Sequence, residues 1–208
     1  MEAGRLHVIA GPMFAGKTEE LLRRVRRARL AGLRAEVFGH RLDDRGGGDR
    51  LSTHTGGGAA AHMLEHADQL LGATSEDPPD MVAVDEAQFF GTSLVPVVQQ
   101  LLESGIRVEV AGLCVTYDGG PFEPLPTLMA TAEEVVKLTA VCSLCGADAA
   151  FHTRLREDAS DPLAATVAQV EDDRRRMSEV DEAQQGRQHR ERDGRPQVDP
   201  PGQHGGGA

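Results

Sequence analysis

Leu6-His-Val-Ile-Ala-Gly-Pro-Met-Phe-Ala-Gly-Lys-Thr18 is the stretch of sequence that decides the fold. Its apolar beginning predicts a buried strand over residues 6–10, and a helical pattern follows directly over residues 18–30. Between them, the spacing Gly-x-x-x-x-Gly-Lys-Thr is that of a phosphate-binding P-loop. The N–H groups of such a loop and the positive end of the next helix bind polyphosphates. We therefore predict a strand, a phosphate-binding loop and a helix in this order.

This loop supplies the first candidate site residues. We expect the nucleotide to lie against all of it, that is, against Gly11, Pro12, Met13, Phe14, Ala15, Gly16, Lys17 and Thr18. Lys17 is expected to reach the β- and γ-phosphates, and the Thr18 hydroxyl to bind Mg²⁺. A glycine-rich turn that binds nothing is the alternative, but the flanking strand and helix both fall where a P-loop needs them.

A second apolar segment ends in acidic residues. Residues 81–84 predict a buried strand, and Asp85-Glu86-Ala87-Gln88 follows it. A carboxylate at the end of such a strand is typical of a Walker B site, where it helps to hold Mg²⁺ beside the P-loop. We expect Asp85 to help bind the metal ion and Glu86 to face the nucleophile. All four residues are included in the predicted nucleotide site. Acids that only begin the following helix are the alternative interpretation.

Other segments predict a parallel α/β sheet. Alternation over residues 34–39 predicts a strand, and strands joined through a helix pair in parallel. Further expectations are a helix over 59–71, a turn over 75–80, a helix over 92–103 and a strand over 107–112. The polar, glycine-rich residues 40–58 predict either a substrate lid or a plain surface loop. The fold class is therefore α/β, with helices flanking the sheet.

The helix after the P-loop carries a cluster of arginines opposite its apolar stripe. They are Arg23, Arg24, Arg26, Arg27 and Arg29. Because Glu19 and Glu20 supply acidic partners in the first turn, we interpret this cluster as a solvated helix face and assign it no function.

Composition limits the classes of function. The 208 residues suffice for one core of ordinary domain size and a small appendage. A net charge of −11 and a pI near 5.1 argue against a nucleic-acid surface. Three cysteines, no apolar leader and no run of 18 apolar residues favour a cytoplasmic protein without a membrane segment.

Several motifs, in one order, resemble those of the cytosolic type II thymidine kinases. They are the P-loop, Asp85-Glu-Ala-Gln-Phe-Phe90, Ala111-Gly-Leu113, Pro121-Phe122 and Cys142-x-x-Cys145-Gly146, and together they cover about residues 4–155. The resemblance implies a RecA-like kinase domain over residues 1–140 and a zinc and lasso lobe over residues 141–170. It also implies a homo-oligomer, commonly a tetramer.

The activity implied by the resemblance is transfer of the ATP γ-phosphate to the 5′-hydroxyl of thymidine, which gives dTMP. Glu86 matches the family's general base, and Lys17 and Mg²⁺ would neutralise charge. The residues that match the family's thymidine site are Met13, Asp43, Arg45, Phe89 and Leu113. One alternative is a catalytically weak or inactive nucleotide-binding paralogue, and another is a P-loop ATPase that acts on DNA.

The carboxyl end departs from the family pattern. A structural zinc site needs four ligands, but no cysteine follows Cys142 and Cys145. We expect either an incomplete zinc site or two reduced structural thiols. His152 stands where the family has threonine, and no aromatic residue follows it to match the lasso tyrosine. Residues 171–208 are charged and poor in apolar residues, which predicts a disordered tail.

Overall fold

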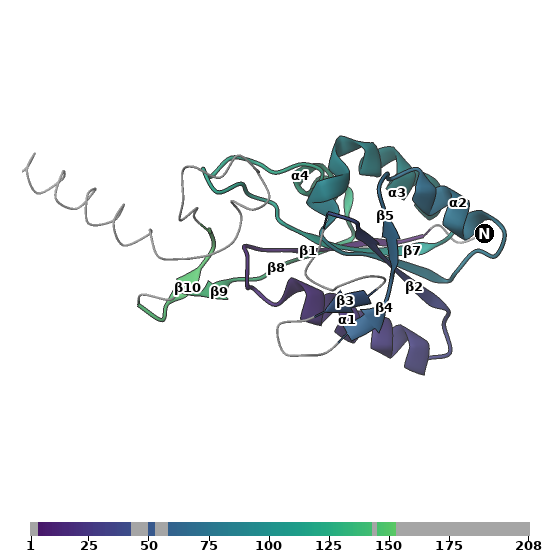
Figure 1. Cartoon of the computed structure of the whole chain (residues 1–208), viewed down its shortest axis with the longest axis horizontal. Helices are drawn as coiled ribbons and strands as arrows, with labels where there is room; N and C mark the ends of the chain where they lie inside the picture. Colours follow the sequence, from purple (N-terminus) through teal and green to yellow (C-terminus); the bar gives the residue numbers. More distant parts are fainter. Residues whose placement is uncertain (1–3, 43–49, 53–57, 143–144, 153–208) are drawn as a thin grey trace, which may run out of the picture. The chain divides into compact units, whose positions relative to one another are not determined.

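A computed structural model of the chain describes residues 4–42, 50–52, 58–142 and 145–152. The main strands are β1 Leu6–Ala10, β2 Ala35–His40, β5 His62–Leu64, β6 Met81–Val84, β7 Arg107–Gly112 and β8 Glu134–Lys137. They form one six-stranded sheet in the order β5-β2-β6-β7-β1-β8 (Figure 1), and every pairing is parallel. The predicted parallel α/β fold is confirmed.

Helices cover both faces of the sheet (Figure 1). One face carries α1 Lys17–Leu30, and the other carries α2 Gln69–Ser75, α3 Leu94–Glu103 and α4 Leu125–Thr131. A 3-10 segment, η2 Ala87–Ser93, leads from β6 into α3. Two short antiparallel pairs complete the described elements: β3 Arg50–Ser52 with β4 Gly58–Ala60, and β9 Ala140–Val141 with β10 Asp148–Ala149.

Alternate residues of the same strands pack against the two helical layers. In β1, Val8 and Ala10 belong to the core beneath α3 and α4, whereas Ile9 packs with α1. All four residues of β6 are buried, because helices cover this parallel strand on both sides. Buried parallel strands therefore appear in the sequence as continuous apolar runs, which is why β1 and β6 could be predicted.

The predicted helix over residues 59–71 is wrong. The chain there forms most of β4 and all of β5, and α2 begins only at Gln69. In β5, His62 pairs with Phe38 and Leu64 pairs with His40 of β2. Pairing at the edge of the sheet outweighs the local helix preference of this alanine- and leucine-rich segment.

The other predicted elements agree more closely. The strands expected over 6–10, 34–39 and 107–112 match β1, β2 and β7 to within one residue. The helix expected over 92–103 is α3, but a 3-10 segment precedes it, and the turn expected over 75–80 overlaps the last residue of α2. Most of the expected lid at 40–58 lies outside the described residues. Within the described ranges, no helix has the length and apolar character needed to cross a membrane.

Candidate functional site

The loop between β1 and α1 contains two residues in the left-handed region. Gly16, directly before α1, has φ of 81°, and Phe14 has φ of 63°. Glycine adopts this conformation freely, whereas a side chain as large as that of Phe14 makes it costly, and such strain concentrates at ligand sites. Gly11 is needed for a different reason. A Cβ atom there would lie 2.8 Å from the Leu138 carbonyl oxygen, so only glycine lets the chain after β8 pack this closely.

The first two residues of α1 direct polar side chains toward the loop and toward β6. Lys17 is only 6% exposed, and its Nζ donates a hydrogen bond to the Pro12 carbonyl oxygen at 2.7 Å. The Thr18 hydroxyl donates to Asp85 Oδ2 at 2.8 Å. Hydroxyl and carboxylate oxygens placed side by side in this way fit a hard cation such as Mg²⁺.

Asp85 and Glu86 form a buried acidic pair after β6, with exposures of 1% and 4%. Burial, together with the charge of Glu86, raises the pKa of Asp85 to about 7. Three contributions lower the pKa of Asp85 but do not offset that rise: the hydrogen bonds from the Thr18 hydroxyl and the Glu86 N–H, and the charge of Lys17. An acidic pair with this shortage of positive charge favours a bound cation.

Glu86 has an uncommon backbone conformation, with φ of 47° and ψ of 44°. For a residue with a side chain this costs on the order of 1 kcal/mol. Its carboxylate accepts a hydrogen bond from Gln88 Nε2, and Gln88 Oε1 accepts one from the Leu113 N–H at 3.0 Å. Gln88, which the sequence predicts to lie in the nucleotide site, therefore contacts Glu86 and Leu113, the residue that follows β7.

A pocket joins the P-loop to Glu86. It is lined by Met13, Phe14, Gly16, Lys17, Thr18, Glu19 and Glu86. Residues from two distant parts of the sequence thus share one hollow, and a carboxylate lies beside the lysine expected to bind phosphate. Such a pocket can hold a polyphosphate and place a proton acceptor next to it.

The predicted thymidine-site residues are only partly brought together. Met13 lines the pocket. Leu113 is buried, and its N–H group is linked to Glu86 through the side chain of Gln88. Phe89 is half-buried, and its ring lies 5.9 Å from the His40 ring in an edge-on contact. Asp43 and Arg45 lie outside the described residues.

Cys142 and Cys145 lie in the connection between β9 and β10. Cys142 is buried and Cys145 is exposed. The Cys142 N–H donates to the Ala147 carbonyl oxygen at 2.8 Å, and the Gly146 N–H donates to the Cys142 carbonyl oxygen at 2.9 Å. In the described ranges, no three His, Cys, Asp or Glu residues are grouped as metal ligands would be. The zinc site stays a prediction, and most of the lobe predicted for 141–170 lies outside the described residues.

His152 is a buried polar residue to which the sequence assigned no role. It is 2% exposed, and neither ring nitrogen has a hydrogen-bond partner within the described part of the chain. Burial, and to a lesser degree the charge of Lys17, lower the pKa of His152, so its imidazole is neutral at pH 7. The sequence signal was the replacement of the family's threonine, which marks the position without revealing its burial.

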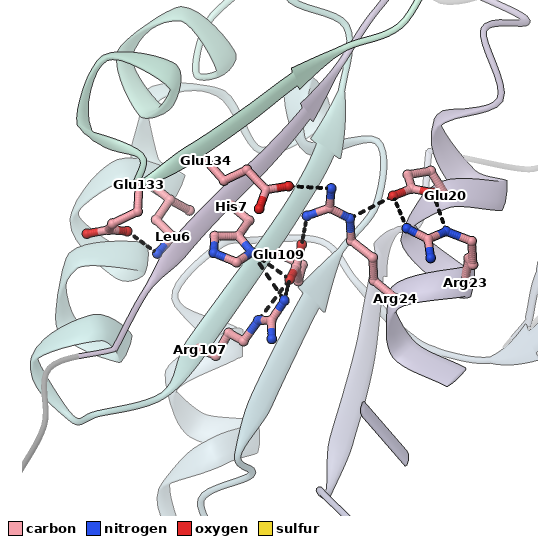
Figure 2. A network of polar contacts seen from close by, with 9 residues as sticks. All are labelled: Leu6, His7, Glu20, Arg23, Arg24, Arg107, Glu109, Glu133 and Glu134. Atoms are coloured by element: carbon pink, nitrogen blue, oxygen red, sulfur yellow. Dashed lines mark hydrogen bonds and ion pairs between the residues drawn. The ribbon is translucent and has the colours of Figure 1, made fainter. Parts of the chain in front are cut away.

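A network of charged side chains lies between α1 and the sheet (Figure 2). At its centre is Glu109 of β7, which is fully buried. Glu109 accepts hydrogen bonds from Arg107 Nε at 2.9 Å and Arg24 Nη1 at 3.1 Å, and its Oε1 lies 3.0 Å from His7 Nδ1. We call these four residues the Glu109 cluster.

Arg24 extends this cluster from α1 toward the edge of the sheet (Figure 2). Its other nitrogens donate to Glu134 Oε1 at 2.7 Å and to Glu20 Oε1 at 2.9 Å, and its side chain is only 11% exposed. The prediction of a solvated arginine face is therefore wrong for Arg24, although it holds for the exposed Arg23, Arg26, Arg27 and Arg29. The partners of Arg24 lie up to 110 residues away, so no local pattern could reveal them.

The fold and the pocket together define an α/β protein with a P-loop beside a buried acidic pair. Comparison with known proteins gives the particular family. The thymidine kinase family profile matches residues 4–184. The chain belongs to the thymidine kinase family.

Individual relatives agree with this assignment. A thymidine kinase from Rhodothermus sp. (strain ITI 518) is 46% identical over 155 residues, which cover 74% of this chain and 72% of that protein. A thymidine kinase from Bacteroides thetaiotaomicron is 41% identical, and the match covers 81% of this chain and 83% of that protein. A thymidine kinase from Deinococcus deserti is 45% identical, and the match covers 73% of this chain and 80% of that protein. The match to a solved DNA replication initiation factor covers 65% of this chain and 40% of that chain at 14% identity. Its TM-score of 0.35 is too low to support a common fold.

Proposed function

We propose that the protein is an ATP-dependent thymidine kinase, which converts thymidine and ATP into dTMP and ADP. The observation that carries this proposal is the pocket in which Glu86 lies beside Lys17 and Thr18. The thymidine kinases that are 40–46% identical to the chain support the choice of acceptor.

In this reaction the residues of the chain mainly bind and orient the substrates. Lys17 would exchange its bond to the Pro12 carbonyl for phosphate oxygens of ATP. The 5′-hydroxyl oxygen of thymidine would attack the γ-phosphorus while Glu86 accepts the hydroxyl proton, and the bond to the β-phosphate oxygen would break to release ADP. Thr18 Oγ1 and Asp85 Oδ2 are the atoms that fit Mg²⁺, which would supply neutralisation of phosphate charge when bound.

Hydrogen bonding supports different roles for the two acids. Asp85 accepts hydrogen bonds at both oxygens, from the Thr18 hydroxyl and from the Glu86 N–H at 3.0 Å. Glu86 instead lines the pocket itself. We therefore assign the proton acceptor to Glu86 and the metal side to Asp85.

The direct test is ADP release from the full chain with ATP and Mg²⁺, measured with thymidine, with other nucleosides and with single-stranded DNA. We expect turnover with thymidine that Lys17→Ala lowers by about 10²-fold or more, because charge-stabilising contacts of this kind contribute roughly 3 kcal/mol to the transition state. The variant must keep the parent melting temperature for this comparison. Turnover that depends on DNA would favour a DNA-dependent ATPase, and no turnover with any acceptor would favour an inactive nucleotide-binding paralogue.

Three further properties are proposed from the family resemblance: a homotetramer, a cytoplasmic location and a zinc ion held partly by Cys142 and Cys145. Light scattering on the purified chain tests the tetramer. Elemental analysis tests the zinc, for which two cysteines predict weak or shared binding. One tightly held zinc per chain would mean that two more ligands exist within it.

A further inference from the structure

We propose that Gln88 is a positioning residue, which holds the Glu86 carboxylate in its catalytic orientation by tying it to the end of β7. The role of Glu86 as the base rests on the proposed function. The tie itself rests on the hydrogen bonds and the packing around Gln88, which are independent of any substrate.

The partners of Gln88 determine which way its amide faces. A backbone N–H can only donate, so the Leu113 N–H must meet the amide oxygen of Gln88, at 3.0 Å. The amide nitrogen is thereby directed at Glu86 Oε2, to which it donates a hydrogen bond. A carboxylate can accept such a bond, so this orientation of the Gln88 amide satisfies both contacts. An amide with its oxygen and nitrogen exchanged would satisfy neither contact.

All three groups are withdrawn from water. Gln88 and Glu86 are each 4% exposed, and Leu113 is 1% exposed. Water cannot readily replace either hydrogen bond at this depth, so the Gln88 amide is a fixed link between the acidic pair and β7.

Gly112 shows that the surrounding backbone is built for this link. A Cβ atom at Gly112 would lie 2.6 Å from Gln88 Oε1 and 2.9 Å from Leu125 Cδ2. The glycine is therefore required for space, because a larger residue would occupy the place where the Gln88 amide meets β7.

A general base must meet its hydroxyl within a few tenths of an ångström, and a glutamate side chain has several torsions that can misplace it. The left-handed backbone of Glu86 determines where that side chain begins. The bond from Gln88 determines where it ends. The two constraints together leave the carboxylate lining the pocket.

A double-mutant cycle tests the proposal with Gln88→Leu and Glu86→Gln, by single-turnover phosphoryl transfer at saturating ATP and thymidine. We expect Gln88→Leu to lower the rate by about 10-fold or more, while ATP affinity and the KM for thymidine change by less than about 3-fold. In the Glu86→Gln background the same substitution should cost less than about 2-fold, because residues that act as a unit are not additive. Equal losses in both backgrounds, or no loss in the first, would overturn the proposal.

Gln88→Glu is the matched variant, because it keeps the size of the side chain and the acceptor for Leu113 but replaces the donor to Glu86 with a carboxylate. At alkaline pH, where the added carboxyl is ionised and has no proton to donate to Glu86, it should be as slow as Gln88→Leu. Parent-like activity at that pH would mean that the bond to Leu113 alone matters, which contradicts the proposal. This variant also serves if Gln88→Leu does not fold.

Crystal structures of the parent and of Gln88→Glu supply a readout that needs no activity. We expect the Glu86 carboxylate to leave its place or to occupy several conformers in the variant. A carboxylate that stays in place would overturn the proposal even with an inactive parent. If the parent is inactive but its Glu86 carboxylate moves when Gln88 is replaced, the proposed thymidine kinase activity is rejected. The role of Gln88 in positioning Glu86 is then still established.

Discussion

The Glu109 cluster and the Asp85–Glu86 pair are both buried carboxylate sites on one parallel sheet, but they are completed in different ways. Glu109 is surrounded by Arg24, Arg107 and His7 from the same chain. Asp85 has a hydroxyl and an N–H as hydrogen-bond donors, and the charge of Lys17 offsets only part of its burial. The first site is satisfied by the fold itself, whereas the second lacks positive charge that a ligand can supply.

The acids near these two sites respond in opposite directions. A hydrogen bond from Arg23, with further help from Arg24, lowers the pKa of Glu20 to about 2, and Arg24 likewise lowers the pKa of Glu134. Burial raises the pKa of Asp85 to about 7. A carboxylate that has cationic partners is structural here, and one that lacks them marks the place where chemistry is expected.

The largest contrast is expected for Glu86→Gln. This substitution keeps the size of the side chain but removes the proton acceptor, so kcat should fall by ~10² to 10⁴-fold. The melting temperature should be unchanged or higher, because a buried charge is removed. ATP should still bind. Stopped-flow kinetics, nucleotide titration and thermal denaturation measure kcat, the ATP affinity and the melting temperature. Loss of ATP binding with an unchanged chemical rate would show that Glu86 is not the base.

Glu109→Gln should behave in the reverse way. The buried guanidinium of Arg24 would lose its ionic partner on β7, and we expect the free energy of unfolding to fall by roughly 3 kcal/mol. Urea denaturation measures this loss, and kcat at a temperature well below the transition should stay within about 3-fold of the parent. Glu134→Gln is the control, because that half-exposed partner of Arg24 should contribute much less. Equal effects of the two substitutions would contradict the central place of Glu109.

Asp85→Asn should reveal the missing positive charge through pH. The Asp85 carboxyl has a pKa of about 7 in the folded state, whereas its usual pKa is 3.8. Between pH 3.8 and pH 7 the folded protein therefore binds a proton that the unfolded chain does not bind. Stability contributed by that proton is therefore lost as pH rises through this window. We expect Asp85→Asn to stabilise the protein by ~1–3 kcal/mol more at pH 8 than at pH 5. Denaturation at both values measures it, and a variant with the parent's pH dependence would contradict a buried, raised Asp85.

The smallest effect is expected at His152, whose ring nitrogens have no hydrogen-bond partner within the described residues. His152→Leu should raise the free energy of unfolding of the substrate-free protein by about 1 kcal/mol, because unpaired buried polar atoms are costly. Thermal denaturation without and with thymidine checks this. A clear loss of stability would mean that the imidazole has a partner in solution.

The sequence predicts the frame of the fold and the position of the P-loop between β1 and α1, because both depend on local patterns. The apolar runs of β1 and β6 and the spacing of the P-loop are contained in short segments, and so is the acidic end of β6. The partners of Arg24 and the role of Gln88 depend on residues far away in the sequence, such as Glu109 and Leu113. The segment that forms β5 shows the same limit, because alanine and leucine favour a helix until an open sheet edge offers pairing.

The left-handed backbone of Glu86 has a consequence for how this protein can be improved in the laboratory. Glycine adopts such a backbone without strain, and it would also remove a buried charge from the acidic pair. Random mutagenesis followed by selection for heat resistance alone should therefore enrich substitutions at Glu86. The selected variants would be more thermostable but would lack the proposed general base. Because we propose Glu86 as the proton acceptor, any such campaign has to select for turnover at the same time.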